Sequence, residues 1–252
     1  MSYFSNGVTG HRGDVHHYPE NTLAGFVSAI DMGCDWCETD LRLTRDGRIV
    51  LSHDHHTGSV AGRRLIIREH DFNELRELNT AVFFNQVHFD RAPMRTVLAS
   101  LEELFELFRS QNTCRISLQP KEPETLPLVR KIATEMKIDD ELLGFNDGSL
   151  EAMRSARELF PGARIFYDVR PQDIDAELDN AGKYGFQEVV VWEYGITSEI
   201  TAKISERGLV PGVWTPNAPA EMDRFLDMGV KRFYTDFPEV LLRKVKVRSF
   251  FA

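Results

Sequence analysis

The sequence predicts an α/β protein built as a closed (β/α)₈ TIM barrel that is interrupted by one irregular insertion. Three observations favour this fold. Strand-like and helix-like segments alternate to the end of the chain, eight such pairs can be counted, and a length of 252 residues is typical of one barrel domain. An open doubly wound sheet is disfavoured, because no G-x-G-x-x-G or G-x-x-x-x-G-K phosphate loop occurs in the sequence.

The first barrel unit begins with a short strand over residues 7–11. Apolar residues then recur at the helical spacing i, i+3, i+4 and i+7 across residues 23–30. Asn21 or Thr22 is expected to cap this helix, and Gly33 is expected to end it.

The second unit begins with a strand over residues 35–41, which alternates in polarity toward Leu43. Asp46-Gly47 lies between this strand and the apolar run at residues 49–51, and Asp-Gly between two apolar runs predicts a β-hairpin. Residues 55–95 are irregular, apart from a short helical stretch at residues 71–78, and we interpret them as an insertion.

The regular alternation resumes at Val97 and continues to the C-terminus. Because no linker, low-complexity tract or close repeat interrupts it, we expect residues 1–252 to form one domain. The strands are expected at residues 114–119, 142–146, 163–168, 187–192, 209–214 and 231–235. The helices are expected at residues 98–110, 124–137, 148–159, 173–184, 197–207, 219–228 and 238–245.

Composition and charge exclude several classes of function. The formal net charge is −9 and no dense Lys/Arg run occurs, so we expect neither a nucleic-acid partner nor adhesion to anionic membranes. No apolar run reaches the length of about 18 residues that a transmembrane helix needs, and the first ten residues lack the apolar core of a signal peptide. A small anionic substrate stays compatible with this charge, since it needs positive charge only inside one pocket.

The three cysteines, Cys34, Cys37 and Cys114, are few and odd in number. Cys34 and Cys37 form a C-x-x-C, but no second Cys/His pair lies at the spacing of a zinc site. We therefore interpret all three as buried structural residues and expect a cytoplasmic protein. The Val82-Phe83-Phe84 run could belong to the core of the insertion, to a lid or to an oligomer contact, so whether the chain forms a homo-oligomer stays open.

Three short polar clusters stand at or near the ends of the first strands, where the catalytic face of a barrel lies: His11-Arg12-Gly13, Glu38-Thr39-Asp40 and His53-Asp54. Glu38 and Asp40 are two residues apart, so both side chains point to the same face of their strand. Two inward carboxylates repel each other unless a cation lies between them, and their oxygen ligands suit Mg²⁺ or Ca²⁺. The alternative, in which each carboxylate pairs with an inward Arg or Lys, stays open.

His11 and His53 flank the carboxylate pair in the sequence. An imidazole with its ordinary pKa near 6.5 suits proton transfer at neutral pH. Cleavage of a phosphodiester needs a base for the nucleophile and an acid for the leaving alkoxide, and the nearby Arg12 guanidinium can stabilise the phosphate charge.

The order and spacing of these clusters resemble the signature of the glycerophosphodiester phosphodiesterase family. The specific part of the resemblance covers residues 11–54, and weaker matches extend it over nearly the whole chain. The matching motifs are His11-Arg12-Gly13, Pro19-Glu20-Asn21-Thr22, Glu38-x-Asp40, Thr44-x-Asp46-Gly47, His53-Asp54, Trp214-Thr215-x-Asn217 and Thr235-Asp236-x-Pro238. The resemblance implies a (β/α)₈ barrel with a small insertion after the second strand, and here that insertion corresponds to residues 55–95.

The resemblance also implies a role for each matching residue, with one divalent cation as cofactor and a small-molecule phosphodiester as substrate. The products would be glycerol 3-phosphate and an alcohol. The implied roles are general acid/base for His11 and His53, metal binding for Glu38, Asp40 and Gln119, phosphate binding for Arg12 and Lys121, contact with the glycerol for Trp214, and ordering of the first loop for Glu20 and Asn21.

One position departs from the family pattern. The third strand of the family usually carries E-x-K, whereas this chain has Gln119-Pro120-Lys121. An amide oxygen can still bind a hard cation, but one negative charge is lost. Two alternatives follow from this change: a related phosphodiesterase that acts on another alcohol or a sugar phosphodiester, or a non-catalytic protein that only binds phosphate.

Overall fold

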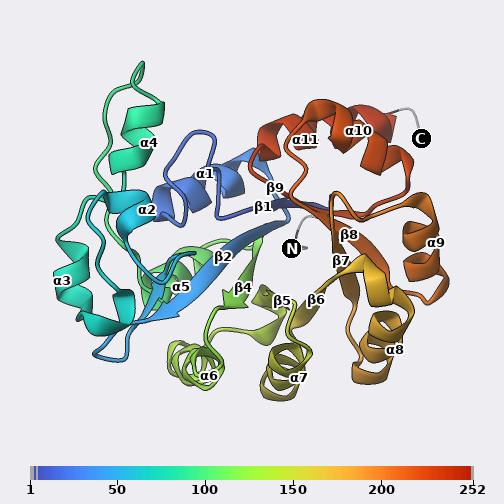
Figure 1. Cartoon of the computed structure of the whole chain (residues 1–252), viewed down its shortest axis with the longest axis horizontal. Helices are drawn as coiled ribbons and strands as arrows, with labels where there is room; N and C mark the ends of the chain where they lie inside the picture. Colours follow the sequence, from blue (N-terminus) through green and yellow to red (C-terminus); the bar gives the residue numbers. More distant parts are fainter. Residues whose placement is uncertain (1–2, 4, 251–252) are drawn as a thin grey trace.

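The computed structural model describes residues 3 and 5–250, so residues 1, 2, 4, 251 and 252 of the expected domain lie outside the described part. Eight parallel strands form a closed ring in the order β1-β9-β8-β7-β6-β5-β4-β2, and β1 pairs with β2 to complete it (Figure 1). The predicted (β/α)₈ barrel is confirmed. The ring consists of β1 (Val8–Gly10), β2 (Trp36–Leu43), β4 (Arg115–Pro120), β5 (Leu143–Asp147), β6 (Arg164–Val169), β7 (Glu188–Trp192), β8 (Val210–Trp214) and β9 (Arg232–Thr235).

Eight helices follow the strands of the ring in the chain and lie outside the barrel (Figure 1). The first ends as predicted at Gly33, which adopts a left-handed conformation with φ 96°, and its cap is Thr22, whose hydroxyl accepts a hydrogen bond from the Gly25 N–H. These helices are α1 (Leu23–Met32), α5 (Leu101–Arg109), α6 (Thr125–Met136), α7 (Leu150–Leu159), α8 (Ile174–Tyr184), α9 (Ser198–Glu206), α10 (Pro219–Asp227) and α11 (Pro238–Phe250).

The insertion lies between β3 (Ile49–Leu51) and α5. The predicted hairpin is present, because β3 pairs antiparallel with the end of β2. The insertion contains α2 (Gly58–Ala61), the 3₁₀ helix η1 (Ile67–Glu69), α3 (Phe72–Arg76) and α4 (Val82–Val87). Of these, only α3 corresponds to the helical stretch expected from the sequence.

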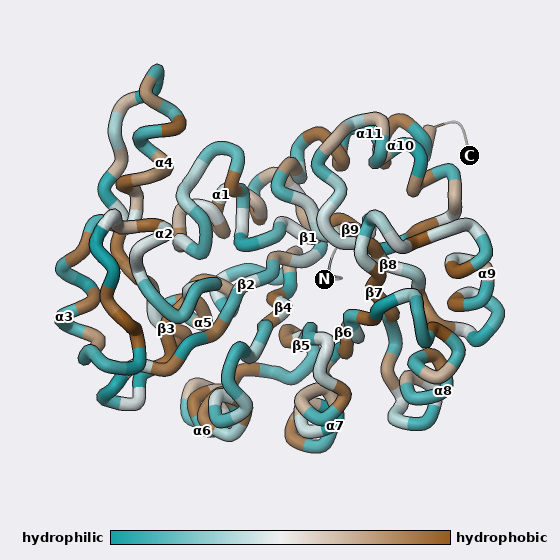
Figure 2. The backbone as a smooth tube through the Cα atoms, in the orientation of Figure 1, coloured by the Kyte–Doolittle hydropathy of each residue, from teal (hydrophilic) through white to brown (hydrophobic). Residues whose placement is uncertain are grey.

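The apolar core has two main layers. A small cluster fills the interior of the barrel, where Trp36 and Phe166 pack edge to face with ring centroids 4.9 Å apart. A larger cluster lies between the strands and the outer helices, and Figure 2 shows hydrophobic stretches along β4 to β7. The three cysteines are buried with free thiols, as expected.

No helix within the described residues has the length and apolar character needed to cross a membrane.

Candidate active site

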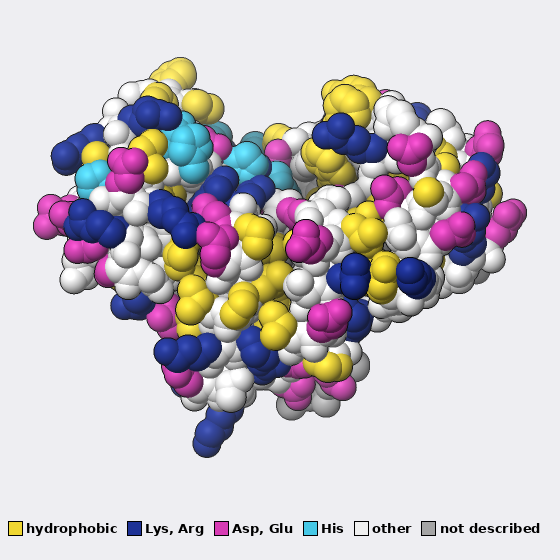
Figure 3. All heavy atoms as spheres, turned by 60° about the horizontal axis from the view of Figure 1, so that its bottom comes forward, with side chains coloured by type: hydrophobic (Ala, Val, Ile, Leu, Met, Phe, Trp, Pro, Cys, Tyr) yellow, Lys and Arg dark blue, Asp and Glu magenta, His cyan; other side chains and the backbone are white. Residues whose placement is uncertain are grey.

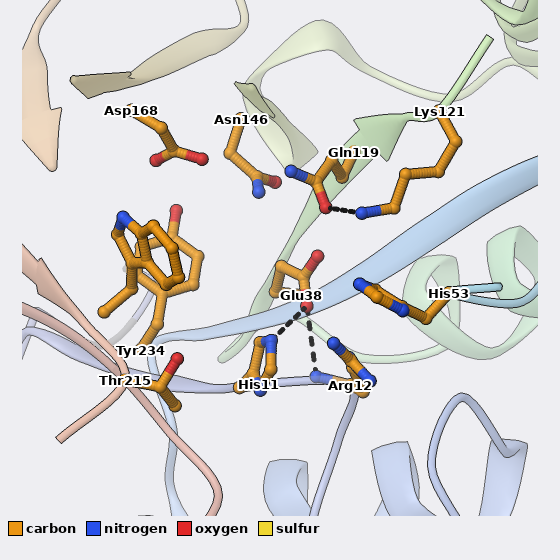
Figure 4. A pocket seen from close by; sticks show the side chains of 11 residues that line it. His11, Arg12, Glu38, His53, Gln119, Lys121, Asn146, Asp168, Thr215 and Tyr234 are labelled. Atoms are coloured by element: carbon orange, nitrogen blue, oxygen red, sulfur yellow. Dashed lines mark hydrogen bonds and ion pairs between the residues drawn. The ribbon is translucent and has the colours of Figure 1, made fainter. Parts of the chain in front are cut away.

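A cavity of about 250 Å³ opens among the carboxyl ends of the barrel strands and the loops that follow them. Figure 3 shows a notch in this face of the molecule, with histidine, lysine and arginine side chains gathered along one edge. The eleven residues that line the cavity are His11, Arg12, Glu38, His53, Gln119, Lys121, Asn146, Asp168, Trp214, Thr215 and Tyr234 (Figure 4).

His11 is fixed at the end of β1 by a carboxylate from the last barrel strand. Its Nδ1 lies 2.7 Å from Oδ1 of Asp236, and the Asn217 amide donates to the other oxygen of Asp236 at 2.6 Å. The Nε2 atom therefore faces Glu38, whose Oε2 lies 4.0 Å away. Burial opposes a charge on the imidazole, but the bond to Asp236 and the nearby Glu38 outweigh it and raise the pKa of His11.

Arg12 adopts a left-handed backbone conformation with φ 55°, which turns its N–H toward Oε2 of Glu38 at 3.1 Å. Its guanidinium lies between two carboxylates, at 3.1 Å from Glu20 and 3.4 Å from Asp40. Arg12 thus faces the cavity while Glu20 holds it from the side.

Glu38 and Asp40 lie on the same face of β2, as the spacing predicts, and each is only 1% exposed. Their surroundings differ. Asp40 pairs with Lys121 at 2.9 Å and accepts from the Asn21 amide at 3.0 Å, so the pKa of Asp40 is lowered despite its burial. Glu38 has no Lys or Arg side chain in direct contact among the described residues, and burial followed by repulsion from Asp40 raises its pKa to about 7. The alternative reading, a carboxylate paired with a basic residue, therefore holds for Asp40 only.

The carboxylate of Glu38 has the chemistry of a ligand for a hard divalent cation. No ready-made cluster of three His, Cys, Asp or Glu ligands is present in residues 3 and 5–250. Glu38 is nevertheless a buried carboxylate short of positive charge, which a cation would supply. Gln119 lines the same cavity, and its Oε1 accepts a hydrogen bond from the Lys121 ammonium, which also contacts Asp40.

His53 approaches the cavity from the loop that follows β3. Its Nδ1 lies 2.9 Å from Asp54, and its carbonyl oxygen accepts two hydrogen bonds from Arg42. The ring is 40% exposed, more than that of His11, so it lies closer to the mouth of the cavity. Trp214, at the end of β8, also lies at the rim and is 39% exposed.

The structure thus brings the ten residues singled out in the sequence together. Seven line the cavity. Of the other three, Glu20 and Asp40 contact Arg12, and the Asn21 amide donates to Asp40.

Five further residues of the site were given no role from the sequence, although two of them, Thr215 and Asp236, belong to motifs of the family resemblance. Asn146, Asp168, Thr215 and Tyr234 line the cavity, and Asp236 supports His11. Four of them were open to the rule applied to Glu38, since a polar residue near the carboxyl end of a barrel strand faces the catalytic end.

Comparison with known proteins gives consistent results. The model of the glycerophosphoryl diester phosphodiesterase family matches residues 11–240. A glycerophosphodiester phosphodiesterase of Bacillus altitudinis is 26% identical over 250 residues, which cover 96% of this chain and 98% of the relative.

Solved structures resemble the fold over its whole extent. A putative glycerophosphoryl diester phosphodiesterase from Silicibacter pomeroyi superposes with a TM-score of 0.85 at 22% identity, covering 96% of this chain and 93% of its own. A phosphodiesterase from Oleispira antarctica, in complex with the product sn-glycerol-3-phosphate, superposes with a TM-score of 0.82 at 22% identity, covering 95% of this chain and 96% of its own.

Proposed function

Because this chain belongs to the glycerophosphoryl diester phosphodiesterase family, we propose that it hydrolyses glycerophosphodiesters to glycerol 3-phosphate and an alcohol. The protein is an enzyme of the phosphoric diester hydrolase type. One observation supports the specific reaction, the hydrolysis of glycerophosphodiesters: a single cavity contains two imidazoles, two basic side chains and a buried carboxylate. The glycerol 3-phosphate held by the Oleispira antarctica relative supports the choice of product.

His11 and His53 form the general acid–base pair of the proposed reaction. Each has its Nδ1 bonded to a carboxylate, Asp236 or Asp54, so each presents Nε2 for proton transfer. One imidazole takes a proton from the attacking hydroxyl or water, and the other gives a proton to the oxygen of the leaving alcohol.

Arg12 and Lys121 hold the phosphate. Both side chains line the cavity, and both are anchored by Asp40, which keeps them in place without substrate. The Arg12 Nε lies 3.4 Å from Asp40 and the Arg12 Nη1 donates to Glu20, so the guanidinium is held from two sides. Glu20 and Asn21 order this loop through Arg12 and Asp40.

The family generally uses a divalent metal, and we assign its ligands here to Glu38, Asp40 and the amide oxygen of Gln119. When bound, Mg²⁺ or Ca²⁺ supplies positive charge that stabilises the phosphoryl group during the reaction. Trp214 covers the glycerol part of the substrate from the rim. The free, buried cysteines support a cytoplasmic location, where thiols stay reduced.

The test is turnover of glycerophosphocholine, with released glycerol 3-phosphate as the measured product. His11→Ala and His53→Ala should each lower kcat by about 10²- to 10⁴-fold, the usual contribution of a positioned acid or base. His55→Ala is the matched control, because His55 is exposed two residues from His53 and does not line the cavity. Unchanged turnover in either cavity variant would refute the acid–base assignment.

A panel of phosphodiesters separates the alternatives that Gln119 raises. Faster turnover of a diester without glycerol would favour another alcohol or sugar substrate. Binding of glycerol 3-phosphate without hydrolysis of any diester would favour a binding protein.

A further inference from the structure

Three polar side chains of the cavity take no part in the proposed acid–base and phosphate-binding chemistry. They are Asn146 at the end of β5, Asp168 in β6 and Tyr234 in β9. All three lie on the side of the cavity opposite Lys121 and His53, and Thr215 lies near Tyr234 (Figure 4).

Asp168 is a half-buried carboxylate without a hydrogen bond or ion pair to any other described residue. Burial, and then repulsion from Asp147 and Glu38, raises its pKa well above the ordinary value. A buried polar group left without a partner costs free energy unless a ligand supplies a hydrogen bond.

The two neighbours of Asp168 in this part of the cavity also have unused hydrogen-bonding capacity. Tyr234 is 3% exposed, and its hydroxyl is buried without a hydrogen bond of normal geometry, although Ser117 lies nearby. Asn146 is 4% exposed, and its Oδ1 accepts from the Ser117 hydroxyl at 2.7 Å, which fixes the amide and leaves Nδ2 as a donor.

The cavity therefore has two chemically different sides. The basic side, with Arg12, Lys121 and His53, suits a phosphate. The opposite side offers an acceptor at Asp168 and donors at Asn146 and Tyr234, a combination that suits hydroxyl groups, since each hydroxyl both donates and accepts.

We propose that Asp168, Asn146 and Tyr234 form a hydroxyl-binding wall that recognises the polyol half of the phosphodiester. The proposal rests on the proposed function and adds the residues that select the substrate. Asp168 accepts a hydrogen bond from one hydroxyl of the ligand, while the Asn146 amide and the Tyr234 hydroxyl donate to hydroxyl oxygens. A ligand that lacks these hydroxyls leaves three buried or half-buried polar groups unpaired, which is an efficient basis for rejection.

A second cavity, of about 490 Å³, adjoins the wall on its outer side. It shares Gln119, Asp168 and Trp214 with the first cavity and extends outward past Asp173 and Glu177.

The test measures binding by calorimetry, with Mg²⁺ or Ca²⁺ held constant in the buffer. The two ligands are glycerol 3-phosphate and ethyl phosphate, which carry the same phosphate monoester group but differ in hydroxyls. The wild-type protein should bind glycerol 3-phosphate at least about tenfold more tightly, since a hydrogen bond to a charged group contributes about that much.

Three variants assign this preference to the wall. Asp168→Ala and the isosteric Asp168→Asn should weaken glycerol 3-phosphate binding by about tenfold and about threefold respectively, and Tyr234→Phe by about threefold, with ethyl phosphate unchanged. Asp173→Asn is the control, because Asp173 is exposed and lines only the outer cavity.

Several outcomes would overturn the proposal. Equal wild-type affinity for both ligands would do so, and so would an equal loss for both ligands in the Asp168 variants. A fall in Mg²⁺ or Ca²⁺ affinity in Asp168→Asn would instead make Asp168 part of the cation site. If the binding pattern holds while no diester is hydrolysed, the wall stands and the proposed reaction fails. If hydrolysis of glycerophosphocholine proceeds unaltered in the Asp168 variants, the reaction stands and the wall fails.

Discussion

At the scale of single residues, the orientation of His11 depends on Asp236. The Asp236 carboxylate contacts Nδ1 of the imidazole at 2.7 Å. The Asn217 side chain holds Asp236 twice, because its NH₂ donates to the carboxylate and its Oδ1 accepts from the Asp236 backbone N–H. Asp236→Asn keeps the shape of this group, but the amide can turn its NH₂ toward the ring and favour the wrong tautomer. We expect kcat to fall by about 10²- to 10³-fold, as for other carboxylate-supported catalytic histidines.

The kinetic pattern distinguishes this role from a loss of structure. KM should change by less than about threefold, and the melting temperature of the variant should stay close to that of the wild type. A raised KM at unchanged kcat would contradict the assignment, because it would show that Asp236 acts on binding alone.

Gln119 is the uncharged member of the three proposed cation ligands. Gln119→Glu adds a carboxylate at the same position, so the affinity for Mg²⁺ and Ca²⁺ should rise by about tenfold, since the number of charged ligands tunes such sites. Calorimetric titration of the metal-free protein measures this change. Gln86→Glu is the control for added charge, because Gln86 is exposed on α4 outside the cavity. Equal affinities in Gln119→Glu and wild type would exclude Gln119 from the cation site.

The sequence predicted the residues that stand in dense polar clusters at the ends of the first strands. It gave no role to isolated polar residues of later strands, or to Asp236 within the motif Thr235-Asp236-x-Pro238. His11, Arg12 and Glu38 were identified because each stands in a dense polar cluster at a strand end. Asp168 has no such cluster around it, and it enters the site only because the closed ring brings the end of β6 to the same cavity as β2. The pairing of Asp40 with Lys121 likewise depends on the β2–β4 register, which local sequence does not encode.

At the scale of secondary-structure elements, the start of α5 shows how a local signal is completed by a tertiary contact. Ser100 and Glu103 form a capping box, in which each side chain accepts from the backbone N–H of the other. Arg76, at the end of α3, adds an ion pair with Glu103 at 2.7 Å and so joins the insertion to the barrel. Burial opposes ionisation, but these contacts outweigh it and lower the pKa of Glu103 from 4.5.

The capping box predicts a pH-dependent contribution to stability. A carboxylate whose folded pKa is lowered stabilises the protein above its unfolded pKa, near 4.5, and this contribution is lost as the pH falls through the folded pKa. Glu103→Gln should therefore lower the free energy of unfolding by about 0.5–1 kcal/mol at pH 7, and by progressively less below pH 4.5. Urea denaturation at pH 7 and pH 3 measures the difference, and Glu106→Gln, on the exposed face of the same helix, is the control. An equal loss at both pH values would contradict the prediction.

The barrel elements were predicted within a few residues, whereas the insertion was not. In the barrel, apolar strand patterns and amphipathic helix patterns alternate eight times along the chain, so each assigned strand or helix supports the assignment of the next. Residues 55–95 contain only short helices, and four to six residues are too few for a helical period to appear. The Val82-Phe83-Phe84 run is part of α4, with Phe83 41% exposed, and its role as lid or contact stays open.

At the scale of the whole molecule, closure of the ring gathers residues from distant parts of the chain. β1 pairs with both β2 and β9, so His11 and Asp236, which are 225 positions apart, meet at one end of the barrel. The sequence predicted a closed barrel from the count of eight units. Which residues become neighbours where β1 meets β9 depends on the register of these two strands, and no local sequence pattern encodes it.

The opposite end of the barrel is held by a buried ion network, and Arg232 is its centre. Arg232 is 6% exposed and binds Asp35 at 2.7 Å and Glu188 at 3.0 Å, so it joins β9 to the starts of β2 and β7.

Arg232→Met leaves both carboxylates buried without this cation, and we expect a loss of about 3–5 kcal/mol in the free energy of unfolding, measured by urea denaturation. Adding Asp35→Asn to this variant should recover part of the loss, because Asp35 loses its ion pair with Arg232, whereas Glu188 keeps its ion pair with Arg164 at 2.5 Å. Since the catalytic cavity lies at the carboxyl ends of the strands and Arg232 does not line it, kcat of the folded variant should match the wild type. A loss below about 1 kcal/mol would show that the network fixes the strand register without stabilising the barrel.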